Sequence, residues 1–156
     1  MAFIVSGLSV APFQPLFGLS DEALAEQGVI RHTADAPLGF PCRVTLEDAP
    51  VGETLLLLNY EHQPADTPYR ARAAIFVRES AVETRTFVDQ IPATLAVRPF
   101  ISLRAFDTDG MMLDAEVSPG AALTAPLERL LSVPGVAYIH AHYAGRGCYA
   151  AHIARD

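Results

Sequence analysis

Most of the chain consists of short segments in which apolar and polar residues alternate, or in which apolar residues run together. Alternation places successive side chains on opposite faces of a strand, and an unbroken apolar run is typical of a strand buried on both faces. The segment TLLLLNY, residues 54–60, predicts such a central strand. In all, the pattern predicts strands over residues 2–8, 29–33, 42–46, 54–60, 74–79, 101–106, 111–117, 136–143 and 148–155.

Two segments have helical spacing instead. Residues 20–28, SDEALAEQG, begin with Ser20 as a capping residue and end at Gly28. Residues 124–135, TAPLERLLSVPG, begin with Thr124 as a cap and place their leucines on one face. The segment 91–100 predicts one or two further helical turns with a proline at an early position.

These elements favour one fold class. Strands dominate and the two clear helices do not alternate with them, so we predict an α+β fold with a mostly antiparallel sheet, two short helices and a C-terminal β-hairpin. No internal repeat, linker or low-complexity tract appears, so residues 1–156 are expected to form a single α+β domain.

The last twenty residues, AYIHAHYAGRGCYAAHIARD, contain three of the five histidines and one of the two cysteines. Loop length decides which side chains of this hairpin share a face, because one residue more or less reverses the pairing of faces. An even loop places His140 and His142 opposite the face of His152. A three-residue loop, Gly145-Arg146-Gly147, gathers His140, His142, His152 and Cys148 on one face. The other face then carries Ile139, Tyr143, Tyr149 and Ile153. We favour the three-residue loop, with Gly147 in the left-handed conformation.

Gathered imidazoles are suitable ligands for a divalent metal such as zinc. We therefore predict His140, His142 and His152 as candidate metal ligands, and His140 and His142 as candidate catalytic residues. The alternative is that these histidines form local hydrogen bonds or face solvent.

A second candidate site is the polar connection NYEHQPADTPYRAR between two strands. Loops beside the ends of buried strands are common positions for binding groups, and arginine matches the geometry of carboxylate and phosphate. The candidate ligand-binding residues for a small anionic molecule are Asn59, His62, Tyr69, Arg70 and Arg72. A solvated connection without a ligand is the alternative.

Composition narrows the function classes. The net charge of -7 argues against nucleic acid and anionic membranes as partners, since both require a dense cationic surface. All eleven cationic side chains are arginine, which excludes a Schiff-base lysine and a Walker A loop. No run is long enough to span a membrane, and the N-terminus lacks a signal-peptide pattern.

Two cysteines, Cys42 and Cys148, are too few for a disulfide framework, so the expected location is cytoplasmic, with reduced thiols. The alternative is a single bridge between the two. Alternation in residues 42–46 turns Cys42 toward the core. The segment DTDG at 107–110 lacks the later ligands of a calcium loop, so its aspartates are expected to form a turn.

Four stretches together resemble one known family. They are GFPCRVTLEDAPVGE, LLLLNYEHQPADTPYRARAAIFVRE, RAFDTDGMMLDAEV and AYIHAHYAGRGCYAAHI, in this order. On these residues the chain is similar to the bacterial Domain of Unknown Function 1203 proteins. The resemblance implies a small bacterial protein and brings no activity, cofactor or catalytic residue with it.

The leading functional hypothesis is a protein that binds a small anionic molecule at a histidine-based site, with or without a metal. The competing hypothesis is a non-catalytic homodimer that pairs through the hairpin or through the edge strand VIRHT. Redox sensing by the two cysteines is a third possibility. Whether the protein is an enzyme is left open.

Overall fold

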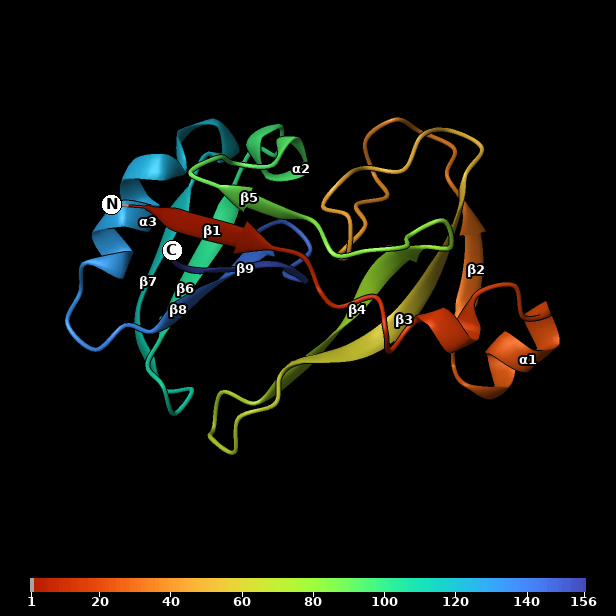
Figure 1. Cartoon of the computed structure of the whole chain (residues 1–156), viewed down its shortest axis with the longest axis horizontal. Helices are drawn as coiled ribbons and strands as arrows, with labels where there is room; N and C mark the ends of the chain where they lie inside the picture. Colours follow the sequence, from red (N-terminus) through yellow and green to blue (C-terminus); the bar gives the residue numbers. More distant parts are fainter. Residues whose placement is uncertain (1) are drawn as a thin grey trace.

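The computed structural model describes residues 2–156, which form nine strands, three α-helices and two 3₁₀ turns (Figure 1). A six-stranded antiparallel sheet has the order β5-β1-β9-β8-β6-β7, and a three-stranded antiparallel sheet has the order β2-β3-β4. The α+β fold with antiparallel sheets and a C-terminal hairpin is thereby confirmed.

The larger sheet contains β1 (Phe3–Ser6), β5 (Thr86–Val88), β6 (Ile101–Phe106), β7 (Met112–Ser118), β8 (Tyr138–Tyr143) and β9 (Tyr149–Arg155). The smaller sheet contains β2 (Ile30–Thr33), β3 (Thr54–Gln63) and β4 (Ala71–Arg78). The helices are α1 (Asp21–Glu26), α2 (Ala93–Ala96) and α3 (Thr124–Leu131), and the 3₁₀ turns are η1 (Gln14–Leu16) and η2 (Gly120–Ala122).

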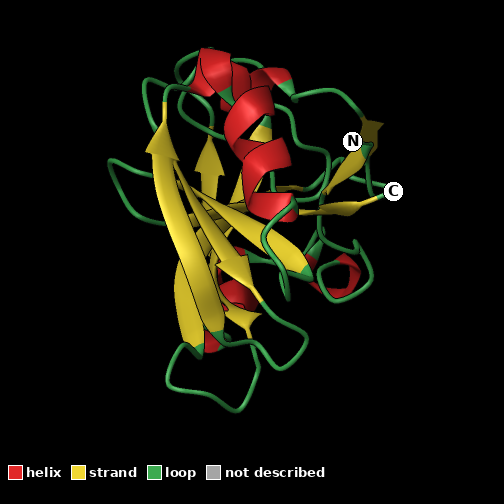
Figure 2. Cartoon of the chain, turned by 90° about the vertical axis from the view of Figure 1, so that its left-hand side faces the viewer, coloured by secondary structure: helices red, strands yellow, loops and turns green. Residues whose placement is uncertain are grey.

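One face of the larger sheet is covered by α3, which crosses the strands in Figure 2. The leucines of α3 at 127, 130 and 131 pack in one cluster with Leu103, Ile139 and Ile153 of the sheet, and all of them are fully buried. Burial of each such side chain contributes about 1.5–3 kcal/mol to stability. This core leaves the opposite face of β6, β8 and β9 free to carry polar side chains.

The smaller sheet has its own apolar cluster with α1, and the two sheets lie beside each other (Figure 1). Ser20 caps α1, because its hydroxyl accepts a hydrogen bond from the Ala23 N–H at 3.1 Å, as predicted. The end of β3 extends past Tyr60 to Gln63, which hydrogen-bonds the Tyr138 hydroxyl of β8 at 2.9 Å. Through this contact β3 brings its last residues against the polar face of the larger sheet.

The predicted strand at 42–46 is wrong. Leu46 has a φ of 54°, and its N–H donates to the Cys42 carbonyl at 3.0 Å, so the segment folds into a turn. Its apolar side chains are buried because the turn is enclosed between the two sheets. Its pairing with β4 is limited to an isolated bridge between Cys42 and Phe76. Cys42 is nevertheless in the core, as predicted, and only 1% exposed.

The other differences are local. Thr124 does not cap α3, because η2 leads directly into the helix and Leu123 occupies the capping position without a side-chain hydrogen bond. β5 was not anticipated, since three residues are too short for a pattern. The aspartate turn is confirmed: the Asp107 carboxylate accepts hydrogen bonds from the N–H groups of Asp109 and Met111. Within residues 2–156, no helix has the length and apolar character needed to cross a membrane.

Candidate metal centre

The loop of the C-terminal hairpin differs from the predicted one. The Tyr143 N–H donates to the Cys148 carbonyl, so four residues, 144–147, form the loop instead of three. Gly147 does adopt the predicted left-handed conformation, with a φ of 81°. By loop length alone, His152 would lie on the face opposite His140.

A β-bulge reverses this outcome. His140 pairs with His152 and Ala141 with Ala151, but His142 pairs with Tyr149, so Ala150 is an extra residue in β9. The extra residue shifts the parity of β9 by one and returns His152 to the face of His140. The predicted gathering of three histidines on one face is therefore present, produced by a longer loop and a bulge together.

The bulge corrects two further assignments, because Tyr149 and Cys148 precede the extra residue. Tyr149 lies among the histidines instead of on the apolar face, with ring centroids 5.1 Å from His140 and 5.9 Å from His142. Cys148 leaves the histidine face and packs against the apolar core, where its sulfur accepts a hydrogen bond from Arg43 Nη2 at 3.2 Å.

The second sheet supplies a further histidine. His62, near the end of β3, stacks on Tyr149 at 5.2 Å between ring centroids and meets the His142 ring edge-on at 5.1 Å. Each of His62, His140 and His142 offers a ring nitrogen, and the three nitrogens lie within 4.8 Å of one another. We call these three residues the histidine centre.

One ring nitrogen in the histidine centre has a hydrogen-bond partner, and two buried ring nitrogens have none among residues 2–156. His142 Nδ1 lies 2.9 Å from the Gly147 carbonyl. Since a carbonyl only accepts, Nδ1 carries the proton and Nε2 is left as the free donor atom for a metal. The Nδ1 atoms of His62 and His140 are buried and have no hydrogen-bond partner among the residues that the structure describes. His140 is only 5% exposed, so this orphaned nitrogen is costly unless a ligand satisfies it.

Burial keeps these imidazoles neutral. Desolvation, with smaller contributions from the neighbouring histidines and Arg104, lowers the pKa of His140 to about 3. Desolvation likewise lowers the pKa of His142 to about 4, and it lowers the pKa of the half-buried His62. Neutral imidazole is the form that binds metal ions.

Arg104 of β6 lies directly across from His140 in the sheet and therefore on the same face. It is half-buried, and within residues 2–156 its side chain has no hydrogen bond or ion pair. Its charge lowers the pKa of all three histidines in the centre. Sequence reasoning missed Arg104, because only the pairing of β6 with β8 brings it next to His140.

The other candidate residues lie outside the centre. The His152 ring stacks on Tyr138 at 5.3 Å and lies 5.8 Å from His140, so His62 takes the place predicted for His152 in the group of three. Arg70 pairs with Glu61 at 3.1 Å, and Arg72 bonds the Asn59 side-chain oxygen at 2.6 Å, and both contacts are exposed. Tyr69 is exposed and contacts Phe106. Of the five predicted ligand-binding residues, only His62 reaches the histidine centre.

Comparison with known proteins identifies a family. The family model described as "Protein of unknown function (DUF1203)" matches residues 39–155. The match covers most of the chain, so the protein belongs to this family. Searches of curated proteins and of solved structures found no significant match.

Proposed function

We propose that this member of the DUF1203 family binds a divalent transition metal through His62, His140 and His142, and that the metal and Arg104 together hold a small anionic molecule. The observation that carries the proposal is the convergence of three imidazoles, two of which have a buried nitrogen without a partner among residues 2–156. Buried polar atoms in proteins generally have a partner, and a metal ion among the three rings would supply one for these nitrogens.

The donor set fits zinc. Three histidines with a free fourth position are one of the ligand sets found in catalytic zinc sites. Tetrahedral zinc with bonds of about 2.0–2.1 Å requires ligand nitrogens about 3.4 Å apart, so small ring rotations would close the present spacing. The bond from His142 to the Gly147 carbonyl is the second interaction expected of a metal-binding histidine, since it fixes the ring orientation.

Arg104 gives the centre its preference for an anion. A metal ion beside an unpaired guanidinium would be repelled by it, and an anion bound between them removes that repulsion. When bound, a metal at this position would polarise an oxygen of the ligand. The protein groups would orient the ligand: Arg104 by its planar fork, and Tyr149 by covering the side where it stacks on His62.

In this proposal His140 and His142 act as metal ligands and not as proton-transfer groups. A pKa of about 3 or about 4 is poorly matched to acid–base catalysis near neutral pH. Both cysteines are free, which agrees with the cytoplasmic location that we propose from composition.

Titration calorimetry of untagged, chelator-treated protein with Zn²⁺ tests the proposal. We expect one site per chain, weakened about 100-fold or more in His62→Ala and His140→Ala. His152→Ala is the matched control, because His152 lies on the same sheet face but outside the group of three, and it should change zinc affinity by less than about threefold. Absence of zinc binding, or an equal loss in the control, would overturn the metal proposal.

The anion is tested on the Co²⁺-loaded protein, whose visible spectrum reports a change of ligand. Inorganic phosphate or acetate should change the spectrum, and Arg104→Gln should weaken that response about tenfold. If neither anion changes the spectrum, the metal and Arg104 do not bind an anion together.

The competing function, a non-catalytic homodimer, has one feature in its favour. β2 is an edge strand of the smaller sheet, and its Ile30 is 57% exposed. The hairpin is no longer a candidate interface, because β8 and β9 lie inside the larger sheet and Ile139 and Ile153 are fully buried. Light scattering should show a dimer that Ile30→Glu dissociates if this function is correct.

A further inference from the structure

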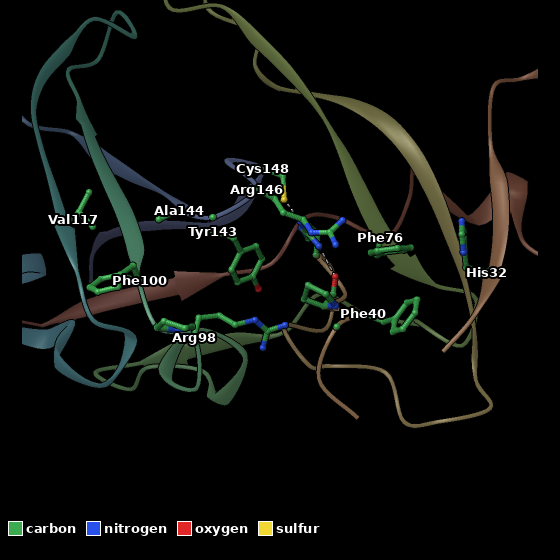
Figure 3. A pocket seen from close by; sticks show the side chains of 15 residues that line it. His32, Phe40, Phe76, Arg98, Phe100, Val117, Tyr143, Ala144, Arg146 and Cys148 are labelled. Carbon is green, nitrogen blue, oxygen red and sulfur yellow. Dashed lines mark hydrogen bonds between the residues drawn. The ribbon is translucent and has the colours of Figure 1, made fainter. Parts of the chain in front are cut away.

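A second site lies at the loop end of the hairpin, away from the histidine centre. A cavity of about 750 Å³ is lined there by fifteen residues from both sheets and from the segment 39–43. Figure 3 shows its two ends, with Phe76 and His32 at one end and Phe100 and Val117 at the other. The volume is within the range of small-molecule binding sites, and most of the wall is apolar.

The charge of the cavity is opposite to that of the chain. Its lining includes three arginines, Arg43, Arg98 and Arg146, and no aspartate or glutamate, although the chain carries a net charge of -7. Arg98 is neutralised from behind the wall by Asp48, with two hydrogen bonds at 2.7 and 2.8 Å. The charges of Arg43 and Arg146 remain uncompensated.

Arg43 gives the strongest indication that the cavity binds an anion. It is only 2% exposed, and its guanidinium donates to the carbonyls of Pro41 and Tyr149 and to the Cys148 sulfur. These partners hold the group in place without cancelling its charge, and none of the described residues forms an ion pair with it. A buried charge without a counter-charge is strongly unfavourable in a protein interior. An anion inside the cavity would supply the missing charge.

Arg146 extends the positive region to the cavity mouth. It is exposed on the hairpin loop and forms no ion pair within residues 2–156. Tyr143 does not offset the positive charge, because burial raises its pKa and keeps the phenol neutral. Its ring instead contacts both Arg43 and Arg98, with each guanidinium carbon 5.1 Å from the ring centroid.

We infer that this cavity binds a small amphipathic carboxylate, with an aromatic or branched apolar body between the phenylalanines and the carboxylate directed at Arg43 and Arg146. The site shares no lining residue with the histidine centre and extends the function beyond the metal site. Arginine binds a carboxylate through two parallel hydrogen bonds, and the apolar walls favour the body of such a ligand over free phosphate.

Cys148 provides a direct reporter, because it lines the cavity and is partly exposed, whereas Cys42 is buried. The probe is 2-naphthoate, and its neutral isostere 2-naphthamide is the matched control ligand. Saturating naphthoate should slow alkylation of Cys148 by iodoacetamide about fivefold or more, as measured by peptide mass spectrometry. Calorimetry should show naphthoate binding about tenfold more tightly than naphthamide.

Two arginine variants locate the anion. Arg146→Gln, at an exposed loop position, should weaken naphthoate about fivefold and leave naphthamide unchanged. Arg72→Gln replaces another exposed arginine, on β4, and should change the affinity for neither ligand. Arg43→Gln should abolish the preference for naphthoate over naphthamide. Circular dichroism shows whether the Arg43→Gln variant folds. If that variant does not fold, Arg146→Gln alone tests the position of the anion.

Equal affinity for the two naphthalenes, or no protection of Cys148, would overturn the inference. Binding of naphthoate that disappears with chelator or in His62→Ala would place the anion on the metal centre instead, which refutes the cavity proposal while supporting the first one. If the protein binds naphthoate but not zinc, the cavity proposal is supported and the metal proposal is refuted.

Discussion

Replacing His140 by leucine separates a metal site from a structural histidine. In the metal-free protein, the buried Nδ1 without a partner costs about 1–3 kcal/mol. Leucine removes that nitrogen and keeps the position apolar. It also replaces three ring contacts, with Phe106, Tyr138 and Tyr149 at 5.1–5.2 Å between centroids, that contribute about 0.5–1.5 kcal/mol each. Burial of the leucine side chain returns about 1.5–3 kcal/mol, so the exchange of contacts costs about 1 kcal/mol.

The balance is a net gain of about 1 kcal/mol in the free energy of unfolding, which raises the melting temperature by about 2–4 °C for a chain of this size. Zinc at 100 times its dissociation constant should stabilise the wild-type protein by about 2.7 kcal/mol, or about 5–10 °C. His140→Leu should show no zinc shift. The variant is therefore expected to be more stable than wild type in chelator and less stable in zinc.

Differential scanning fluorimetry in chelator and in zinc measures both effects. His152→Leu is the control, since it removes a partly buried histidine from the same face; it should gain nothing in chelator and keep the zinc shift. A melting temperature of His140→Leu well below wild type in chelator, with no zinc shift in wild type, would refute the reasoning and assign His140 a structural role.

Two further predictions concern stability. Arg31 lowers the pKa of Glu79 to about 2 through its side-chain hydrogen bonds, so this ion pair stabilises the fold above the unfolded pKa near 4.5 and is lost as pH falls toward 2. Glu79→Gln should therefore cost about 1–2 kcal/mol at pH 7, after allowance for solvent screening, and nearly nothing at pH 2, as measured by urea unfolding. Gly147→Ala should cost about 1 kcal/mol because of its left-handed φ of 81°, while Gly145→Ala in the same loop should cost much less; an equal loss in both would refute the conformational explanation.

Most strands were predictable because the order of apolar and polar residues in each one matches which of its faces are buried. The apolar run in TLLLLNY and the alternation in ISLRAF are typical of strands that are buried by neighbouring elements. Both segments are strands in the structure. Residues 42–46 alternate equally well but form a turn, since alternation reports burial and not hydrogen bonding. The division into two sheets depends on long-range pairing, which no local pattern contains.

The gathering of His140, His142 and His152 on one face was predicted from a three-residue loop, but the structure produces it in another way. The loop has one residue more than expected and β9 has one extra residue at the bulge, and these two shifts cancel at His152 but not at Tyr149 or Cys148. Nothing local marks the bulge, because Ala150 and Ala151 are equally small and both buried. His62 and Arg104 come from β3 and β6, so their approach to His140 follows from packing between sheets and between strands.

Anomalous X-ray scattering from crystals of the zinc-loaded, untagged protein tests the central claim most directly. We expect a single strong peak at the zinc edge, about 2.0–2.1 Å from one ring nitrogen each of His62, His140 and His142, with its open side toward Arg104. A peak bound by His152 in place of His62, or no peak among these histidines in zinc-soaked crystals, would contradict the account.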